Sequence, residues 1–540
     1  MIAGIAYCLR SLGILSVPSS VGTLAFMPQN YTNPANIFQK KVINLLLDFK
    51  PQNLKPMITF TACLAALVIG YFTYGKFVER FFGVSSDRPT PAKRLADGVD
   101  YQEMKPWRIF IIQFLNIAGL GPIFGAILGA AYGPVAYIWI VVGCIFMGAA
   151  HDFFSGMLSV RNDGMSLPDM VGKYLGSGVR KFLVIFSAFI LIAVGVSFVT
   201  GPADLLHTLT GWDKRIWLYI VFAYYIIATL LPVDKIIGKL YPFFGAILLF
   251  MAIAIAGALL VKGFSGEIHL TELTADGLRN FHSNPESNIL IPMLFVVISC
   301  GAISGFHSTQ SPIMARCLSD EKYGRPIFYG AMIAEGIVAM IWATAAIAYF
   351  GGPEGLNAAA DAGKTPAIMV DEICQSWLGK VGAVIAILGV VVCPITSGDT
   401  AFRSLRLTIG DALKFNQKPI RNRLFVAIPI FIVAFILCKV DFSTIWKYVG
   451  IGNQILATVV TWTAAAYLVR NGRNHLMMSL PATFLTFICV CYFMIAPYNV
   501  GGLSLPSTVS YISGTAAALG LFIFFIIKTK KPRGQIPSAS

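Results

Sequence analysis

Charged residues are scarce in this chain. Only 12% of its 540 residues are Asp, Glu, Lys or Arg, whereas about a quarter of an average soluble domain is charged. Hydrophobic residues make up 56% of the sequence, and the mean hydropathy is +0.72. This composition excludes a soluble globular protein. It also excludes nucleic-acid binding, which would need a basic soluble domain.

Metal-binding and catalytic motifs are missing as well. The ten cysteines are scattered, and none belongs to a Cys-x-x-Cys pair or a Cys/His cluster at metal-binding spacing. There is no HExxH or GxSxG motif, and no separate domain to carry a cofactor. We therefore expect no disulfide, no metal, no cofactor apart from a coupling ion, and no enzymatic activity.

Apolar runs of roughly 20 residues recur along the whole chain, which is typical of a polytopic helical membrane protein. We predict an all-α fold with about thirteen transmembrane helices. The predicted spans lie near 57–78, 109–132, 134–158, 181–206, 216–232, 236–262, 288–311, 326–350, 378–401, 422–438, 443–468, 475–496 and 506–528.

The distribution of basic residues predicts the topology. If the first span ends in the cytoplasm, most of the 41 Lys and Arg residues fall on the cytoplasmic side, as the positive-inside rule requires. The basic connections are 76–108, 161–181, 316–325, 403–423 and the tail 528–533. The net charge of +15 therefore indicates orientation, with a cytoplasmic C-terminus.

Residues 1–56 do not fit this pattern. They are apolar but interrupted by Arg10, Pro18 and Gly22, and they lack the layout of a signal peptide. Four lysines between positions 40 and 55 would lie on the wrong side of the membrane. We expect Met57 to be the true start and the preceding residues to be upstream sequence. A native, weakly ordered extension is the alternative.

Two spans are interrupted. The span near 109–132 carries Gly119, Gly121 and Pro122 in its middle, and these residues disfavour a helix. In lipid, such a break persists only where protein or a watery cavity satisfies the freed backbone groups. The span near 288–311 contains Gly301 and Gly305 together with a run of hydroxyl residues that ends at Pro312.

The two interruptions divide the chain into repeats of five spans each, 109–262 and 288–468. Because five is odd, the repeats enter the membrane from opposite faces, which is the pattern of an inverted-repeat secondary transporter. The segment 57–108, a helix and a basic loop, precedes the repeats, and 469–540, two helices and a basic tail, follows them. Helix packing alone is the alternative, because Gly121, Gly125 and Gly129 form a GxxxGxxxG ladder.

Polar residues and glycines around the interruptions are candidates for substrate binding. Backbone N–H groups freed after Gly121 would suit a substrate carboxylate, and a histidine in the second break could hold or titrate against one. The candidates are Gln113, Asn116, Gly119, Gly121, Gly301, Ser304, His307, Ser308, Thr309 and Gln310.

Five blocks of sequence are distinctive. They are RPTPAKRLADGVDY (88–101), GPIFGAILGA (121–130), HDFFSGMLSVRNDG (151–164), SGFHSTQSPIMARC (304–317) and ITSGDTAFRSLRL (395–407). In this order they resemble the carbon starvation protein A family, from about residue 57 to about 425. The resemblance implies an inner-membrane transporter of peptides or pyruvate, driven by an ion gradient and used in starvation. It also implies kinship with LeuT-type transporters.

Glu335 is the ionisable residue most deeply placed by the predicted spans. It lies nine residues into the span near 326–350, hence about 14 Å deep in a hydrocarbon core of about 30 Å. Ionisable residues at such depth are usually functional. We predict that Glu335 and His307 carry a coupling proton. A protonated glutamate that only bonds a neighbouring helix is the alternative.

Four residues near 400 form a candidate cation site. In LeuT-type transporters the corresponding helix lends hydroxyls to a sodium site completed by carbonyls of the first broken helix, so the resemblance implies this role for Thr396, Ser397, Asp399 and Thr400. Oxygen ligands suit a hard cation. A capped helix end paired to Arg403 is the alternative.

His151 and Asp152 lie near the predicted cytoplasmic end of their span. They are candidates for an interfacial gate, or for a simple ion pair with Arg161. Together these features predict a secondary transporter that imports peptides or pyruvate by proton or sodium symport. Its partners are a small-molecule substrate and membrane lipids. A channel or sensor that responds to small carboxylates is the alternative, although no filter-like repeat supports it.

Overall fold

The computed structural model describes residues 57–530, apart from 99, 231–232, 416 and 418. The chain divides into two units, Met1–Leu54 and Lys55–Ser540, and all the described residues belong to the second. Residues 1–56, predicted to be an extension, lie outside the described residues. The described residues are helical and contain no strand, which confirms the predicted all-α fold.

The first half contains α3 (Ile58–Phe72), α4 (Tyr74–Phe82), α5 (Pro91–Arg94), α6 (Pro106–Ile117), η2 (Gly121–Gly125), α7 (Ala126–Ala130), α8 (Val135–Ile138), η3 (Trp139–Gly148), α9 (Ala149–Arg161), α10 (Leu167–Leu175), α11 (Ser177–Thr210), α12 (Lys214–Leu230), α13 (Val233–Ser265) and η4 (Asp276–Leu278). The second half contains α14 (Leu290–Val297), α15 (Gly305–Ala315), η5 (Glu321–Tyr323), η6 (Arg325–Tyr329), α16 (Gly330–Tyr349), α17 (Pro353–Asp361), α18 (Pro366–Ala412), α19 (Ile420–Leu437), α20 (Phe442–Arg470), α21 (Leu476–Ile495), η7 (Tyr498–Val500) and α22 (Ser507–Lys530). Segments η2, η3 and η6 are π-helical.

Ten helices in the described residues are long and apolar enough to cross a membrane, or eleven if the bent pair that begins with α6 is one span. The predicted number of thirteen is therefore not confirmed. The difference lies in α12, which has 17 residues, and in α14 and α15, which have 8 and 11. Each of these is shorter than the roughly 20 residues of a complete span.

The first predicted interruption is confirmed. Helix α6 ends at Ile117, and the chain resumes as π-helix at Gly121 with a bend of 56° between the two helical pieces. Gly119 lies in this bend and lets it pack closely against Phe198, because an added Cβ would lie 2.3 Å from Cζ of that ring. Pro122 stands in the first turn of the new helix, where its missing N–H costs little.

The second interruption lies between Val297, the end of α14, and Gly305, the start of α15. Gly301, with a φ of +90°, reverses the chain there. The prediction that His307 lies inside the break is wrong, because His307 and the hydroxyl residues after it belong to α15. Hydroxyl side chains fit into a helix when they donate to a carbonyl of the preceding turn. Ser308 does so, because its hydroxyl donates to the carbonyl of Gly305 at 2.5 Å.

The glycine ladder joins the two broken helices. A Cβ on Gly121 would lie 2.0 Å from Cβ of Cys300, and one on Gly129 would lie 2.1 Å from Cγ1 of Ile298. The carbonyl oxygen of Val297 stands 3.0 Å from the equivalent position on Gly125. The ladder therefore packs against the second break. Its first glycine, Gly121, also lies at the interruption of the first span, so close helix packing and the break occur together.

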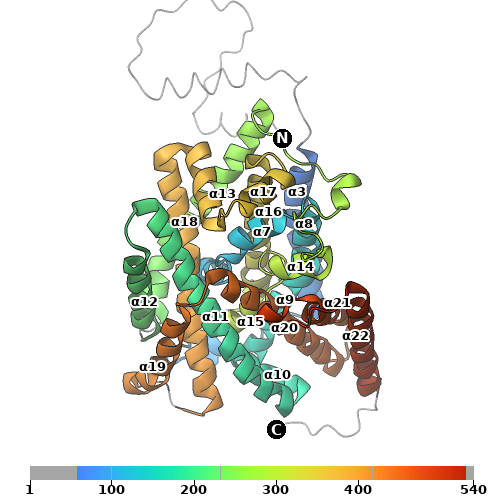
Figure 1. Cartoon of the computed structure of the whole chain (residues 1–540). Helices are drawn as coiled ribbons and strands as arrows, with labels where there is room; N and C mark the ends of the chain where they lie inside the picture. The colour runs from blue at the N-terminus through green and yellow to red at the C-terminus, as the bar shows by residue number, and fades with distance from the viewer. Residues whose placement is uncertain (1–56, 99, 231–232, 416, 418, 531–540) are drawn as a thin grey trace, which may run out of the picture. The chain divides into compact units, whose positions relative to one another are not determined.

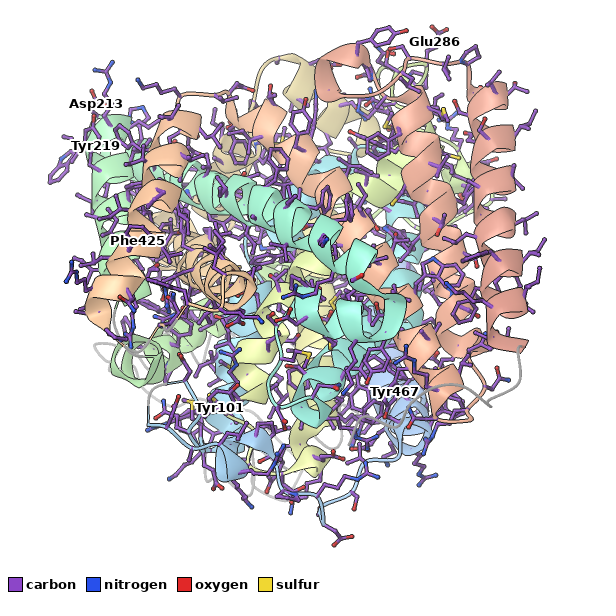
Figure 2. All side chains as sticks on the ribbon, turned by 90° about the horizontal axis from the view of Figure 1, so that it is seen from below. Tyr101, Asp213, Tyr219, Glu286, Phe425 and Tyr467 are labelled. Carbon is purple, nitrogen blue, oxygen red and sulfur yellow. The ribbon has the colours of Figure 1, made fainter. Side chains whose placement is uncertain are left out.

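The connections gather at two ends of the helix bundle. Asp213 and Glu286, from connections predicted to lie outside the cell, appear in the upper part of Figure 2, whereas Tyr101 and Tyr467, from the predicted cytoplasmic side, appear in the lower part. In Figure 1, α17 lies in the upper part of the bundle and α10 near its bottom, so the two ends are separated in that view as well. We refer to the Glu286 side as the outer end and to the Tyr101 side as the inner end.

Candidate functional site

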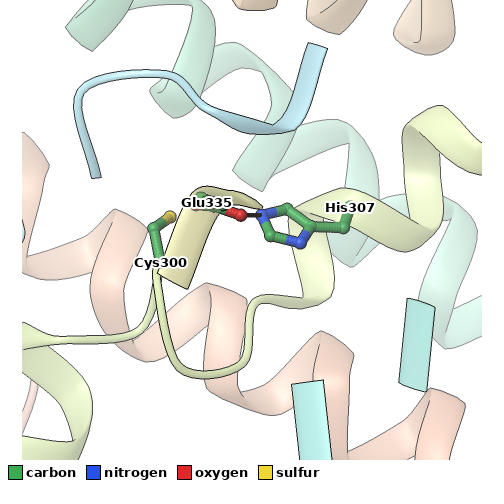
Figure 3. A group of neighbouring side chains, drawn as sticks. All are labelled: Cys300, His307 and Glu335. Atoms are coloured by element: carbon green, nitrogen blue, oxygen red, sulfur yellow. Dashed lines mark ion pairs between the residues drawn. The ribbon is translucent and has the colours of Figure 1, made fainter. Parts of the chain in front are cut away.

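Four ionisable residues form a continuous buried chain between the two ends. Nδ1 of His307 lies 2.9 Å from Oδ2 of Asp152, and Nε2 of the same ring lies 3.3 Å from Oε2 of Glu335. Oδ1 of Asp152 lies 2.8 Å from Nδ1 of His151. All four side chains are fully buried. We name His151, Asp152, His307 and Glu335 the His307 cluster, and Figure 3 shows Glu335 facing the His307 ring.

Small residues let three helices meet at this cluster. Asp152 comes from α9, His307 from the first turn of α15 and Glu335 from α16. A Cβ on Gly148, just before α9, would lie 2.1 Å from the carbonyl oxygen of Ala302, and one on Gly301 would lie 2.5 Å from Cβ of Ala339 in α16. The second break can therefore approach α9 and α16 closely enough for the ionisable groups to touch.

The charges of the cluster require bound protons. Two carboxylates flank one imidazole ring, and a buried charge is tolerated only when it is paired. With His307 protonated, both carboxylates contact a positive ring and one net negative charge remains. A second proton, on Glu335, makes the cluster neutral. The arrangement can therefore bind and release a proton at membrane depth.

Cys300 lies beside this cluster. The ligand atoms of Cys300, His307 and Glu335 all lie within 4.8 Å of one another, which is the spacing that a bound metal ion would need. Sequence analysis missed this group, since its members share no spacing motif and come from two helices and a break. A structural zinc site uses four protein ligands, and the His307 ring already contacts two carboxylates. We therefore assign no metal here.

Gln113 and Asn116 lie one turn apart on α6, just before the first break. Both are fully buried, and neither side-chain amide has a hydrogen-bond partner among the described residues. A buried amide without partners costs free energy, and a polar ligand at the break would satisfy this pair. Of the predicted substrate residues, these two have the strongest structural support.

The other predicted substrate residues are occupied by contacts within the protein. Gly119, Gly121 and Gly301 permit close packing. Ser304 accepts from Sγ of Cys300 at 3.6 Å, and Nε2 of Gln310 donates to Oγ1 of Thr309 at 2.8 Å. Ser308 and Thr309 donate to carbonyls of their own helix.

The predicted cation site divides into two parts. The hydroxyls of Thr396 and Ser397 donate to the carbonyl of Leu115, at 3.0 and 2.9 Å, so they do reach the end of the first broken helix. Asp399 instead accepts from the hydroxyl of Tyr241 at 3.3 Å and lies 3.8 Å from Nη2 of Arg403.

Thr400 also turns away from the break, because its hydroxyl donates to the carbonyls of Thr396 and Ser397 in its own helix. The capped and paired arrangement therefore describes Asp399 and Thr400, while Thr396 and Ser397 meet the carbonyl that a cation site there would use.

A cavity of about 970 Å³ opens at the outer end and reaches the second break and the helix that follows the first break. Phe124, Ser299, Cys300 and Asn453 line it where the breaks meet. Nδ2 of Asn453 lies 4.0 Å from Sγ of Cys300, and its Oδ1 has no partner among the described residues. Sequence analysis missed Asn453, although an amide inside the apolar span 443–468 was a usable signal.

The predicted ion pair between Asp152 and Arg161 is wrong. The guanidinium of Arg161 contacts Glu321, with Nε 3.1 Å from Oε1, and donates to the hydroxyl of Tyr467 at 2.6 Å. Nine residues separate Asp152 from Arg161, which is about 13 Å along a helix. Asp152 is buried against His307 instead, and the other alternative, an interfacial gate at His151 and Asp152, stays a prediction.

Comparison with known proteins places the chain among membrane transporters. Residues 55–201 and 197–381 match the family described as "Carbon starvation protein CstA". An uncharacterized membrane protein of Haemophilus influenzae is 46% identical over 57% of this chain and 95% of its own length. The peptide transporter CstA of Bacillus subtilis is 26% identical over 80% of this chain and 88% of its own.

More distant proteins share the fold or part of the sequence. The pyruvate/proton symporter BtsT of Escherichia coli is 24% identical over 53% of this chain and 48% of its own length. The crystal structure of MhsT in complex with L-phenylalanine covers 79% of this chain and 99% of its own, with a TM-score of 0.50 at 10% identity. That likeness concerns the fold, which is the LeuT-type fold that the family resemblance implied.

Proposed function

The chain belongs to the CstA carbon starvation protein family and is a membrane transporter rather than an enzyme, and we propose that it imports peptides or pyruvate by proton symport. The observation that carries the proposal is the position of His307 between the carboxylates of Asp152 and Glu335. Such a cluster offers a proton site at membrane depth, next to a cavity that opens at the outer end.

The proposed route begins in the outer cavity. A substrate carboxylate enters from the outer end and binds where the two breaks meet, at the backbone N–H groups that follow Gly121 and near Gln113 and Asn116. The start of a helix carries partial positive charge, which favours a carboxylate. A proton from the cavity reaches Glu335 and His307 past Cys300, which lines the cavity and adjoins both residues.

The proton balances the charge of the substrate. A monocarboxylate brings one negative charge into a site that already holds two carboxylates, and a proton taken up on Glu335 cancels it. Release of both to the cytoplasm returns the cluster to its starting charge. Asp152 holds the opposite nitrogen of His307, so we include it and His151 in the coupling unit rather than in a gate.

Sodium is the second candidate for the coupling ion. The observation in its favour is that Thr396 and Ser397 both contact the carbonyl of Leu115 at the end of α6. A sodium ion there would use these hydroxyls and end-of-helix carbonyls as oxygen ligands. We favour the proton because the His307 cluster is made of titratable groups.

We also propose the inner membrane of a bacterium as the location, with the C-terminus in the cytoplasm. The excess of Lys and Arg in alternate connections supports both the location and the orientation.

Uptake into liposomes tests the proposal. The full chain is reconstituted under an imposed inward proton gradient without sodium, and uptake of labelled pyruvate and of a labelled alanine dipeptide is followed. We expect one of them to accumulate and an uncoupler to abolish the accumulation. Uptake of neither compound, with or without sodium, would overturn the proposed function. Accumulation that needs sodium would overturn proton coupling alone.

A further inference from the structure

Helix α18 carries three charged residues on one buried face, Asp399, Arg403 and Arg406. Their exposed fractions are 0%, 1% and 2%. The first two compensate each other, because Oδ1 of Asp399 lies 3.8 Å from Nη2 of Arg403, which also donates to the carbonyl of Ala228 at 2.6 Å. The charge of Arg403 therefore has a counter-ion.

Arg406 has no such counter-ion. Its Nη1 donates to Oε1 of Gln417 at 2.7 Å, and its Nε has no hydrogen-bond partner among the described residues. No carboxylate of the described part of the chain pairs with it within 4.0 Å. The side-chain nitrogen of Gln417 is also buried without a partner. A buried guanidinium that meets only a neutral amide is costly, and in a membrane protein it marks a functional pathway.

Neighbouring residues add positive charge at the same end. Arg316 at the end of α15 and Arg423 on α19 are each only 8% exposed. Nε of Arg423 donates to the backbone carbonyl of Gln417 at 2.8 Å, the residue that Arg406 also contacts. Asp411 lies 3.9 Å from Arg316. These guanidinium groups add positive potential around Arg406, which favours an anion.

The helix end does not account for this arrangement. Carbonyls at the end of α18 attract cations within the last turn, whereas Arg406 stands six residues before Ala412, the last residue of the helix. Attraction by the helix end also leaves Nε of Arg406 unbonded. A planar group that matches the fork of a guanidinium would satisfy Nε and Nη2 together.

We propose that Arg406 is an anion site at the inner end, which takes the carboxylate of the substrate once the transporter opens to that side. This inference rests on the proposed function for the identity of the anion, and it names a site distinct from the His307 cluster and the outer cavity. Carboxylate binds the guanidinium through two oxygens, and its charge supplies the missing counter-ion. Inorganic phosphate offers the same chemistry from the cytoplasm, so the test separates the two.

The first experiment compares the two sides of the membrane. Liposomes with one known orientation of the chain carry wild-type protein, Arg406→Gln, Arg406→Lys or the control Arg421→Gln, whose side chain is exposed. KM for pyruvate and for the alanine dipeptide is measured from each side. We expect Arg406→Gln to raise the inner-side KM about tenfold, as for loss of one charge-assisted pair, with the outer-side KM unchanged.

The lysine variant keeps the charge, so it should recover part of the inner-side affinity, and Arg421→Gln should behave as wild type. Equal KM values for wild type and Arg406→Gln on the inner side would overturn the proposal. If Arg406→Gln does not fold, Arg406→Lys replaces it, because loss of the planar fork alone should raise the inner-side KM. An unchanged value in that variant would overturn the proposal too.

Direct binding keeps the inference separate from the transport function. Thermal unfolding of the detergent-solubilised chain is measured with pyruvate, the alanine dipeptide or inorganic phosphate at constant ionic strength. Stabilisation by pyruvate or the dipeptide that disappears in Arg406→Gln supports the carboxylate site even if no transport is found. Stabilisation by phosphate alone, or by none of the three, overturns it.

Discussion

The two ends of the helix bundle differ in how they are built. The outer end contains a cavity of about 970 Å³ that reaches the second break and the helix after the first break. The inner end is closed by arginines that tie separate elements together: Arg161 contacts Glu321, and Nε of Arg325 donates to Glu79 at 2.8 Å. The structure is therefore open to one side, and the closed side is held by polar contacts that water can replace.

The same comparison explains why these contacts suit a gate. The guanidinium of Arg161 also donates to the carbonyl of Gly83 at 2.6 Å and stands 4.0 Å above the ring of Phe82. A tightly packed apolar seal would have to expose hydrocarbon when it opens, whereas these charged and backbone groups can exchange one partner for water. An opening at the inner end consequently requires several such contacts to break together.

The largest effect should come from the cluster that lies between the two ends. Glu335→Gln removes the titrating carboxylate but keeps its shape, so accumulation driven by a proton gradient should fall by roughly 100-fold, the usual scale for loss of a proton-transfer group. Exchange of labelled for unlabelled substrate, which needs no net proton movement, should persist. Glu354→Gln serves as the control, since Glu354 is 67% exposed. Normal accumulation by Glu335→Gln would remove the coupling role.

The second effect concerns the inner closure. Arg161→Ala combined with Glu321→Ala removes a pair whose side chains are 16% and 2% exposed without leaving a buried charge, so the population should shift toward an inner opening. Cys300 lines the outer cavity, and its labelling by a membrane-impermeant thiol reagent should slow about fivefold. All proteins in this experiment also carry Cys438→Ser, because Cys438 lines the same cavity and would react with the reagent too.

The matched control for this variant is the exposed pair of Arg94 and Asp163, whose side chains are 49% and 51% exposed. Its double alanine replacement should leave the labelling rate unchanged, since exposed ion pairs contribute little. Equal labelling of Cys300 in all three proteins would contradict the assignment of Arg161 and Glu321 to the inner closure.

A smaller effect is expected where the two broken helices touch. Gly121→Ala places a Cβ 2.0 Å from Cβ of Cys300, and overpacking of this kind costs about 1–3 kcal/mol. The melting temperature should fall, and Cys300→Gly should restore part of the loss. Gly257→Ala in α13 meets nothing within 4 Å and should not destabilise. An unaltered melting temperature for Gly121→Ala would show that the breaks pack less closely than described.

The smallest effect should follow Thr396→Ala. The variant removes one of two hydroxyls that donate to the carbonyl of Leu115, a loss of about 1 kcal/mol, so proton-driven uptake should fall no more than about fivefold. Thr400→Ala is the control, because that hydroxyl bonds only its own helix. Complete loss of uptake in Thr396→Ala, together with a requirement for sodium, would move the coupling ion to this site.

Sequence patterns predicted what depends on local chain chemistry. Two glycines and a proline in the middle of an apolar run disfavour a continuous helix through their own backbone chemistry. The break is present where Gly119, Gly121 and Pro122 predicted it. The family was predicted from contiguous blocks, and it is confirmed. The transmembrane helices were predicted from length alone, so their number differs where α12, α14 and α15 are short.

Contacts between helices could not be predicted in the same way. Asp152, His307 and Glu335 lie on α9, α15 and α16, and nothing in their spacing indicates that one ring touches both carboxylates. Asp399 stands beside Thr396 in the sequence, yet the helix turn directs it to Tyr241. The amino-acid sequence indicates which polar residues lie at membrane depth, whereas the packing of the helices decides which of them contact each other.

The π-helical segment η3, Trp139–Gly148, immediately precedes the helix that carries His151 and Asp152. A π-helix bonds each residue to the fifth rather than the fourth along the chain, so it turns through a smaller angle per residue and delays the phase of everything after it. Removing one residue from η3 would rotate α9 by about 100°, carrying Asp152 away from His307. A one-residue insertion or deletion in η3 would thus abolish the contact between Asp152 and His307 as effectively as a substitution of either residue.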